Sequence, residues 1–272
     1  MFITENLILL EYPKATSTYL RLFIKLYYNF NVQKKGIHNP ITSDEIYKKI
    51  DNDAIKVIGS VRNPYSFYVS LRAFNIQNKG KDGIDNRIGL HRSLFTKSGL
   101  KSIVRNPMVL FRDLSDWKDT YVDSHSTENF QRWIELFIDK KTQHVHPLYA
   151  KISHRMGYAT YLYFMLYTKR FNKNYKELLN QNISLEDYYQ KFKFPIEIVK
   201  TETIYDDLVE SSISLNLDKV KVIRIQDEML QKKKHFNASK RKKYTEYYSK
   251  EIIELVAQKD KWLIEKYNYK FI

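Results

Sequence analysis

The chain has 272 residues, of which 43% are hydrophobic, and it contains no cysteine. The lack of cysteine excludes a disulfide framework and a thiolate zinc site. Lys and Arg number 46 against 31 Asp and Glu, a formal net charge of +15. This excess indicates an anionic partner, such as a nucleotide, a nucleic acid, a membrane surface or an acidic glycan.

The N-terminal residues carry no leader pattern of a basic segment, an apolar segment and a small-residue cleavage site. The longest aromatic and apolar run, 157–167, is shorter than the roughly 20 residues that span a bilayer. We therefore expect a soluble, cytoplasmic protein with no membrane span. Its length fits a single α/β domain.

The first 30 residues predict a strand, a polar loop and a helix. Residues 6–11 (NLILLE) form the short, continuous apolar run of a buried parallel strand. Apolar residues then recur at helical spacing over Leu20–Tyr27, with Thr16 or Ser17 available as N-cap. The loop therefore lies between the end of a strand and the start of a helix.

The same order of elements recurs after residue 54. Residues 55–61 (IKVIGSV) predict a second buried strand, and Arg62–Asn63 a turn. A helix follows over Pro64–Phe74, because proline suits the first turn of a helix. Between the two units, Ser43 is placed to cap a short helix that ends at Ile50.

The later segments predict further strands and helices. The strands are 196–200 and 219–225 (KVKVIRI), the second near a sheet edge because it carries charge, and the helices are 127–138, 204–215 and 249–267. Residues 75–126 are basic and weakly periodic, which suggests a lid over an acceptor. Strands that alternate with helices predict an α/β fold with a central, mostly parallel sheet flanked by helices.

The loop Pro13–Thr18 (PKATST) has the properties of an anion site. A helix N-terminus presents unpaired N–H groups and a positive dipole end. Lys14 adds a cation, and Thr16, Ser17 and Thr18 add hydroxyl donors. The alternative is an ordinary Ser/Thr-capped surface loop. The nucleotide-kinase pattern G-x-x-x-x-G-K-[ST] is absent, because here the lysine opens the loop and there is no glycine.

A second anion-binding pair is predicted in 61–71 (VRNPYSFYVSL). Arg62 ends a strand and Ser70 follows eight residues later, close to two helical turns of about 7.2 residues. An arginine fork and a hydroxyl on that helix face are thus able to converge on one phosphate. The alternative is an arginine at a strand end and a serine packed inside a helix.

Together these segments resemble the sulfotransferases that use 3′-phosphoadenosine 5′-phosphosulfate (PAPS). PKATST is similar to the family's 5′-phosphosulfate loop, in which many members have Gly where Thr16 stands. VRNP followed by Ser70 resembles its 3′-phosphate segment. The resemblance implies a single domain, 1–272, with the P-loop nucleoside-triphosphate-hydrolase-like sulfotransferase fold. A helical acceptor-side insertion would cover about 75–195.

The resemblance also implies a chemistry and a set of site residues. Lys14, Ala15, Thr16, Ser17 and Thr18 would bind the 5′-phosphosulfate, and Arg62 and Ser70 the 3′-phosphate. Lys14 would also stabilise charge on the bridging oxygen during in-line transfer to a hydroxyl or amine. The expected partners are PAPS, its product 3′,5′-ADP, and a saccharide acceptor, which can itself be anionic. No metal is expected.

His38 is the leading candidate for the catalytic base. Residues 36–46 (GIHNPITSDEI) resemble the stretch that leads into VRNP in carbohydrate-type members, whose base is commonly a His or Glu. Imidazole titrates near neutral pH and accepts a proton at working pH. The alternative is a loop histidine bonded to backbone. The remaining histidines are weaker candidates: His91, His125, His144, His146, His154 and His235.

Near the C-terminus, 231–243 (QKKKHFNASKRKK) is strongly basic. The family often places basic residues here against the donor's phosphates, so Lys234, Lys240 and Arg241 are candidates. Glu202, at a strand end, is interpreted as structural, and Asp206–Asp207 as acids at a helix N-terminus rather than metal ligands. Two other functions stay open: a nucleotide kinase that uses the same loop, and a nucleic-acid-binding protein.

Overall fold

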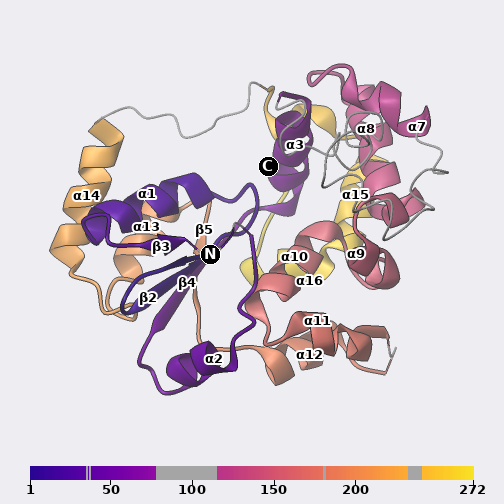
Figure 1. Ribbon diagram of the computed structural model, residues 1–272. Coiled ribbons are helices and arrows are strands. Elements are labelled where there is room, and N and C mark those ends of the chain that lie inside the picture. Colours follow the sequence, from indigo (N-terminus) through magenta and orange to yellow (C-terminus); the bar gives the residue numbers. More distant parts are fainter. Residues whose placement is uncertain (35, 37, 78–114, 180–181, 232–240) are drawn as a thin grey trace, which may run out of the picture. The chain divides into compact units, whose positions relative to one another are not determined.

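The computed structural model describes residues 1–34, 36, 38–77, 115–179, 182–231 and 241–272 (Figure 1). The chain divides into two compact units. We call Met1–Asn63 with Ala159–Ala238 the sheet unit, and Pro64–Tyr158 with Ser239–Ile272 the helical unit. These boundaries differ from those of the expected insertion at 75–195, and the single domain stays a prediction. In the described ranges, no helix is long and apolar enough to cross a membrane.

The sheet unit confirms the α/β class. Its described residues form one five-stranded sheet in the order β3-β1-β2-β4-β5. The strands are β1 (Phe2–Ile3), β2 (Leu7–Leu10), β3 (Gln33–Lys34), β4 (Lys56–Val61) and β5 (Glu197–Lys200). β2, β4 and β5 are parallel, whereas β1 is antiparallel to both β2 and β3. The sheet is therefore mixed, which corrects the expected mostly parallel sheet. The two-residue strands β1 and β3 are too short to produce a sequence pattern.

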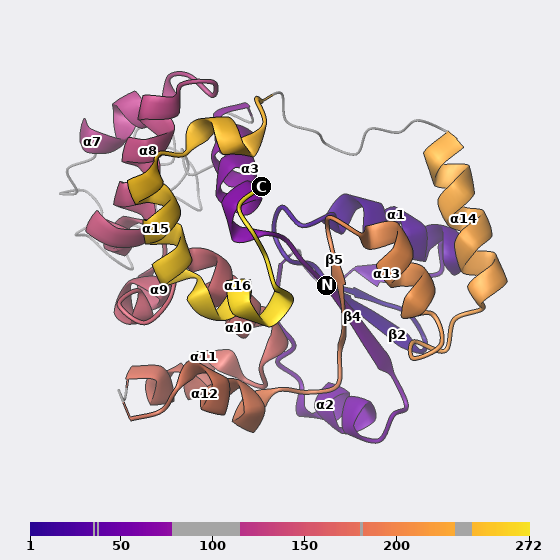
Figure 2. The same ribbon diagram turned by 180° about the vertical axis from the view of Figure 1, so that it is seen from behind.

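One face of the sheet is covered by α1 (Ser17–Tyr27), α13 (Ile204–Glu210) and α14 (Lys219–Gln231). Alternate strand residues, among them Leu9, Ile58 and Val199, join these helices in one buried hydrophobic cluster. Figures 1 and 2 show α1 and α14 side by side in both views. This packing anchors α1, and with it the loop that precedes α1.

The opposite face of the sheet packs against α10 (Tyr158–Tyr167). Gly59 in β4 makes this approach possible, because a Cβ atom there would lie 2.7 Å from Tyr167 Cε1. The described residues of the sheet unit also form the helices α2 (Asp44–Asp51), α11 (Phe171–Asn174) and α12 (Leu185–Phe192) and the 3₁₀ turn Tyr175–Leu179. As predicted, the Ser43 hydroxyl caps α2 by accepting from the Ile46 N–H.

The helical unit has an aromatic core. Its described residues form the helices α3 (Pro64–Gln77), α7 (Ser115–Lys118), α8 (Thr127–Glu135), α9 (Pro147–Ile152), α15 (Lys250–Lys259) and α16 (Lys261–Tyr267). The same ranges contain short turns: the π turn Leu136–Lys140 and the 3₁₀ turns Asp119–Tyr121, Thr142–His144 and Tyr244–Tyr247. Trp133 stacks on Phe137, with ring centroids 4.6 Å apart. The buried Asp260 separates α15 from α16, so the predicted helix 249–267 is two helices.

One predicted strand is wrong. Residues 219–225 form the start of helix α14. Val222, Ile225 and Met229 recur at helical spacing and are buried, whereas Val220 is 77% exposed. A strand would have put Val220 and Val222 on the same face. The segment KVKVIRI fits both periods, and the packing of Val222 into the hydrophobic cluster selects the helix.

Candidate functional site

The candidate site lies where the three parallel strands end. β2 leads into the loop Pro13–Thr18, β4 into Arg62–Asn63, and β5 into Thr201–Glu202. In open α/β sheets, ligands bind outside the carboxyl ends of the strands. All three segments belong to the sheet unit, so their contacts are described within one compact body.

The Tyr167 hydroxyl ends the pairing between β2 and β4. The last residue pair of this ladder is Leu10 with Gly59. At the next residue, the Ser60 N–H donates to the Tyr167 hydroxyl (3.0 Å), and that hydroxyl donates to Ser60 O (2.6 Å). The Tyr167 hydroxyl therefore takes the place of the next β2 residue. This leaves the chain free to depart from the sheet and form the loop.

The loop 13–18 has an unusual backbone. Lys14 and Thr16 have positive φ angles of 60° and 51°. Turns of this kind in front of a helix form concave arrangements of N–H groups that bind anions. The conformation at Thr16 also explains why Gly suits this position, since glycine adopts positive φ without steric cost. The Thr16 Oγ1 atom is buried and has no hydrogen-bond partner among the described residues.

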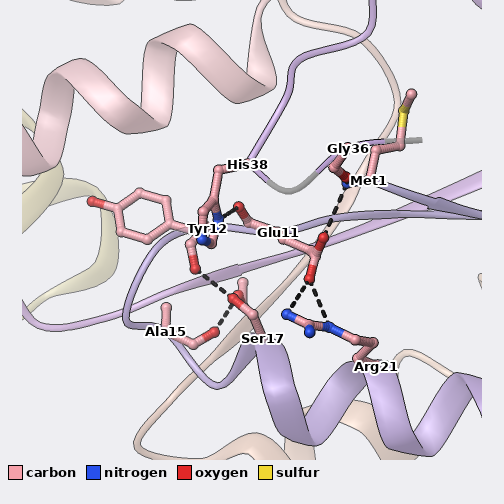
Figure 3. A network of polar contacts seen from close by, with 9 residues as sticks. Met1, Glu11, Tyr12, Ala15, Ser17, Arg21, Gly36 and His38 are labelled. Carbon is pink, nitrogen blue, oxygen red and sulfur yellow. Dashed lines mark hydrogen bonds and ion pairs between the residues drawn. The ribbon is translucent and has the colours of Figure 1, made fainter. Parts of the chain in front are cut away.

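Three carbonyl groups, two in the loop and one just before it, are bound to protein donors. Tyr12 O accepts from the Ser17 hydroxyl (2.6 Å), as Figure 3 shows, and Ala15 O accepts from the Ser60 hydroxyl (2.6 Å). Lys14 O accepts from Arg62 Nη1 (2.9 Å). Carbonyl oxygens repel an anion, so an anion-binding loop must direct them away from its ligand. The first N–H groups of α1 have no acceptor inside the helix and lie at its positive end.

Of the predicted hydroxyl donors, Ser17 has another role. Its single hydroxyl proton is donated to Tyr12 O, so the hydroxyl closes the loop and only its backbone N–H remains for a ligand. Thr16 stands at the N-cap of α1, but its side chain makes no capping bond. Ala15 is fully buried, and Lys14 and Thr18 are partly exposed.

Arg62 contacts the loop directly. Arg62 Nη1 reaches Lys14 O across 48 residues of sequence. At the residue after Arg62, the Asn63 N–H donates to Glu202 Oε1 (3.0 Å). The interpretation of Glu202 as a structural residue stays a prediction. Ser70 is buried in α3 of the helical unit, whereas Arg62 belongs to the sheet unit. The convergence of Arg62 and Ser70 on one phosphate stays a prediction.

His38 lies beside the start of the loop (Figure 3). Its Nδ1 is 2.7 Å from Glu11 O. A carbonyl only accepts, so Nδ1 carries the proton and Nε2 holds the lone pair of the neutral ring. Burial lowers the pKa of His38 below its ordinary value of 6.5, although the Glu11 carbonyl and carboxylate act in the opposite direction. His38 is therefore neutral at physiological pH, as a base must be.

Glu11 holds the segment that carries this carbonyl. Its fully buried carboxylate pairs with Arg21 Nη2 (2.7 Å) and with the Met1 amino group (3.0 Å). A buried carboxylate requires such partners, because an unpaired charge in the interior is costly. The ion pair with Arg21 ties the end of β2 to α1.

The other candidate histidines and basic residues either lie outside the described residues or belong to the helical unit. His91, His235, Lys234 and Lys240 lie outside the described residues, as does the side chain of His144. The remaining candidates belong to the helical unit: His125, His146, His154 and Arg241. His146 Nδ1 caps α9 by accepting from the Leu148 N–H.

Asp206 and Asp207 lie in the first turn of α13, as predicted. Asp207 Oδ2 accepts from the Lys200 N–H (2.6 Å) and its Oδ1 from the Thr203 hydroxyl (2.8 Å). Among the described residues, no group of His, Asp and Glu side chains is arranged to hold a metal ion.

The sequence analysis did not identify Ser60 or Tyr167 as residues that shape the site. For Ser60, the sequence does contain a signal. Ser60 is a fully buried hydroxyl within the apolar run KVIGSV, and a buried hydroxyl must find a partner. Tyr167 lies 107 residues from Ser60 in a segment where most residues are aromatic or apolar. Nothing local distinguishes it from the tyrosines around it.

Comparisons with known proteins give no family. No protein-family model matches the chain, and neither the curated proteins nor the solved structures contain a match. Function is therefore inferred from the residues of the site and their contacts.

Proposed function

We propose that this chain is a PAPS-dependent sulfotransferase that transfers a sulfuryl group to a hydroxyl or amine of an acceptor. The observation that carries the proposal is the loop 13–18. The carbonyls of Lys14 and Ala15 in the loop, and of Tyr12 just before it, are bound by protein donors, and one of these donors is Arg62. This arrangement favours an anion held by N–H groups at the start of α1, with a guanidinium beside it.

Two features favour PAPS over ATP. The loop lacks the glycines and the closing Gly-Lys-Ser/Thr of a nucleotide kinase. Arg62 adds a planar fork that suits a phosphate, and in the proposal it binds the 3′-phosphate, which ATP lacks. Ser70 joins Arg62 at that phosphate as an expected partner.

The residues of the loop have distinct proposed roles. The backbone N–H groups of residues 16–18 and the hydroxyl of Thr18 bind the 5′-phosphosulfate. The Ala15 N–H instead donates to Tyr12 O (3.4 Å), so Ala15 contributes to the shape of the loop. Lys14 neutralises the charge that builds up on the bridging oxygen as the S–O bond breaks. The electron pair of that bond stays with the phosphate, and 3′,5′-ADP leaves.

His38 is the proposed base. Its Nδ1–H is held by Glu11 O, which leaves the Nε2 lone pair to accept the proton of the acceptor hydroxyl as the new S–O bond forms. We propose a saccharide as acceptor, in keeping with the resemblance of 36–46 to carbohydrate-type members. The formal net charge of +15 suits an anionic saccharide.

A thermal-shift titration tests the donor. The wild-type chain is titrated with 3′,5′-ADP, with its isomer 2′,5′-ADP, with ATP plus Mg²⁺, and with a single-stranded oligonucleotide. We expect selective stabilisation by 3′,5′-ADP, because the isomer carries the same groups with one phosphate displaced. The shift should disappear in Arg62→Ala.

Arg224→Ala is the matched control. Arg224 is an exposed residue of α14 in the same unit, so its replacement removes one positive charge without touching the loop. The control should keep the response to 3′,5′-ADP. Equal stabilisation by ATP would favour the kinase, and a response to the oligonucleotide alone would favour nucleic-acid binding. Either result would overturn the proposed function.

A further inference from the structure

The backbone on both sides of Arg62 is held by the two residues that follow β5. The N–H and the hydroxyl of Thr201 both donate to Val61 O, at 2.8 and 3.0 Å. Glu202 Oε1 accepts from the Asn63 N–H at 3.0 Å. Val61 O belongs to the peptide unit before Arg62, and the Asn63 N–H belongs to the unit after it.

These two peptide units set the direction of the Arg62 side chain. A planar peptide leaves only the two dihedrals of a residue free, so fixing both neighbouring planes fixes its Cα–Cβ vector. The far end of the side chain is held as well, by the bond from Nη1 to Lys14 O. Arg62 is thus oriented from both ends before any ligand binds.

The contact between Glu202 and the Asn63 N–H brings a negative charge close to the turn that carries Arg62. A carboxylate beside an arginine that binds an anion weakens anion binding by repulsion. The Glu202 side chain is exposed, so core packing does not require it. Its bond to the Asn63 N–H is charge-assisted and stronger than a bond between neutral groups. An orienting effect of this bond on the turn would offset the repulsion.

We infer that Glu202, together with Thr201, is a positioning residue that orients Arg62 toward the phosphate of its ligand. The identity of that ligand rests on the proposed function. A guanidinium held in the binding geometry loses less conformational freedom on binding, which raises affinity. The charge effect and the positioning effect have opposite signs, and this allows an experiment to separate them.

The affinity for 3′,5′-ADP is measured by calorimetry in Glu202→Ala and Glu202→Gln. Positioning predicts that the alanine variant binds about tenfold more weakly, the effect of losing one charge-assisted hydrogen bond. The glutamine variant should stay within about threefold of wild type, because its amide oxygen accepts the same N–H.

Glu210→Ala is the matched control, because Glu210 is an exposed acid at the end of α13 in the same unit. It should leave the affinity unchanged or raise it slightly. Tighter binding by Glu202→Ala would show that only its charge matters and would overturn the inference. Should Glu202→Ala fail to fold, Thr201→Val tests the peptide unit on the other side of Arg62 and should also weaken binding.

A ligand-free measurement separates this inference from the proposed function. Nitrogen-15 relaxation of the Arg62 Nε–H group reports the mobility of the side chain. We expect greater mobility in Glu202→Ala and wild-type behaviour in Glu202→Gln. If wild type binds no 3′,5′-ADP, the proposed function fails while this result still decides the role of Glu202. Unchanged mobility in the alanine variant would overturn that role.

Discussion

Replacing Tyr167 by Phe removes a single oxygen atom from the edge of the candidate site. That oxygen accepts from the Ser60 N–H (3.0 Å) and donates to Ser60 O (2.6 Å). The Phe ring keeps the packing against Gly59 and the stacking on Tyr12. Both Ser60 groups are buried, so the change leaves one donor and one acceptor without a partner.

The expected loss of stability follows from these two groups. An unsatisfied buried polar group costs about 1–3 kcal/mol, so two of them give a loss of about 2–6 kcal/mol in the free energy of unfolding. Tyr28→Phe is the matched control. It makes the same chemical change in the same unit, but the Tyr28 hydroxyl bonds Asn6 Oδ1 in an exposed position. Its loss should stay below about 1 kcal/mol.

The assay must report on the sheet unit. All three tryptophans belong to the helical unit: Trp117, Trp133 and Trp262. Tryptophan fluorescence therefore reports unfolding of the helical unit and not of the sheet unit. Urea unfolding is therefore monitored by far-UV circular dichroism, and hydrogen exchange of the Ser60 amide is measured alongside. We expect faster exchange and an earlier midpoint in Tyr167→Phe. A change no larger than that of Tyr28→Phe would refute the reasoning about the Ser60 groups.

Three further predictions concern the loop, the base and α14. Thr16→Gly should leave the chain equally stable or up to about 1 kcal/mol more stable in urea, because it relieves a positive φ and removes an unpaired hydroxyl; a clear loss of stability would contradict this. The folded state lowers the pKa of His38 below 6.5, so the neutral ring is favoured and stability should fall as the pH drops through and below 6.5. His38→Asn should flatten this pH dependence, measured as urea midpoints at about pH 5 and pH 7.5, and an unaltered profile would count against it. Val222→Ser should lower the free energy of unfolding by about 1–3 kcal/mol while Val220→Ser has little effect; equal losses would argue against helix α14.

The sequence by itself was enough to locate the elements that carry the loop. The apolar runs of β2, β4 and β5 and the start of α3 at Pro64 were predicted to within about two residues. Such elements are set by short-range physics: a buried run, a capping hydroxyl or a proline acts over a few neighbouring residues. The position of Pro13–Thr18, between a strand end and a helix start, follows from the same local patterns.

Other features depended on the tertiary structure. KVKVIRI satisfies the periods of both a strand and a helix, and only burial of Val222 against the sheet selects the helix. β1 pairs through two residues, which leave no periodic pattern.

The loop 13–18 separates what the sequence predicts from what tertiary contacts decide. Its residues and its place in the chain were enough to predict an anion site. Its shape is decided by contacts from afar: Tyr167 at the end of β2–β4 pairing, and Ser60 and Arg62 on the loop carbonyls. These partners are 45 or more residues away from the groups they bind, and a hydrogen bond at that separation leaves no local pattern to recognise.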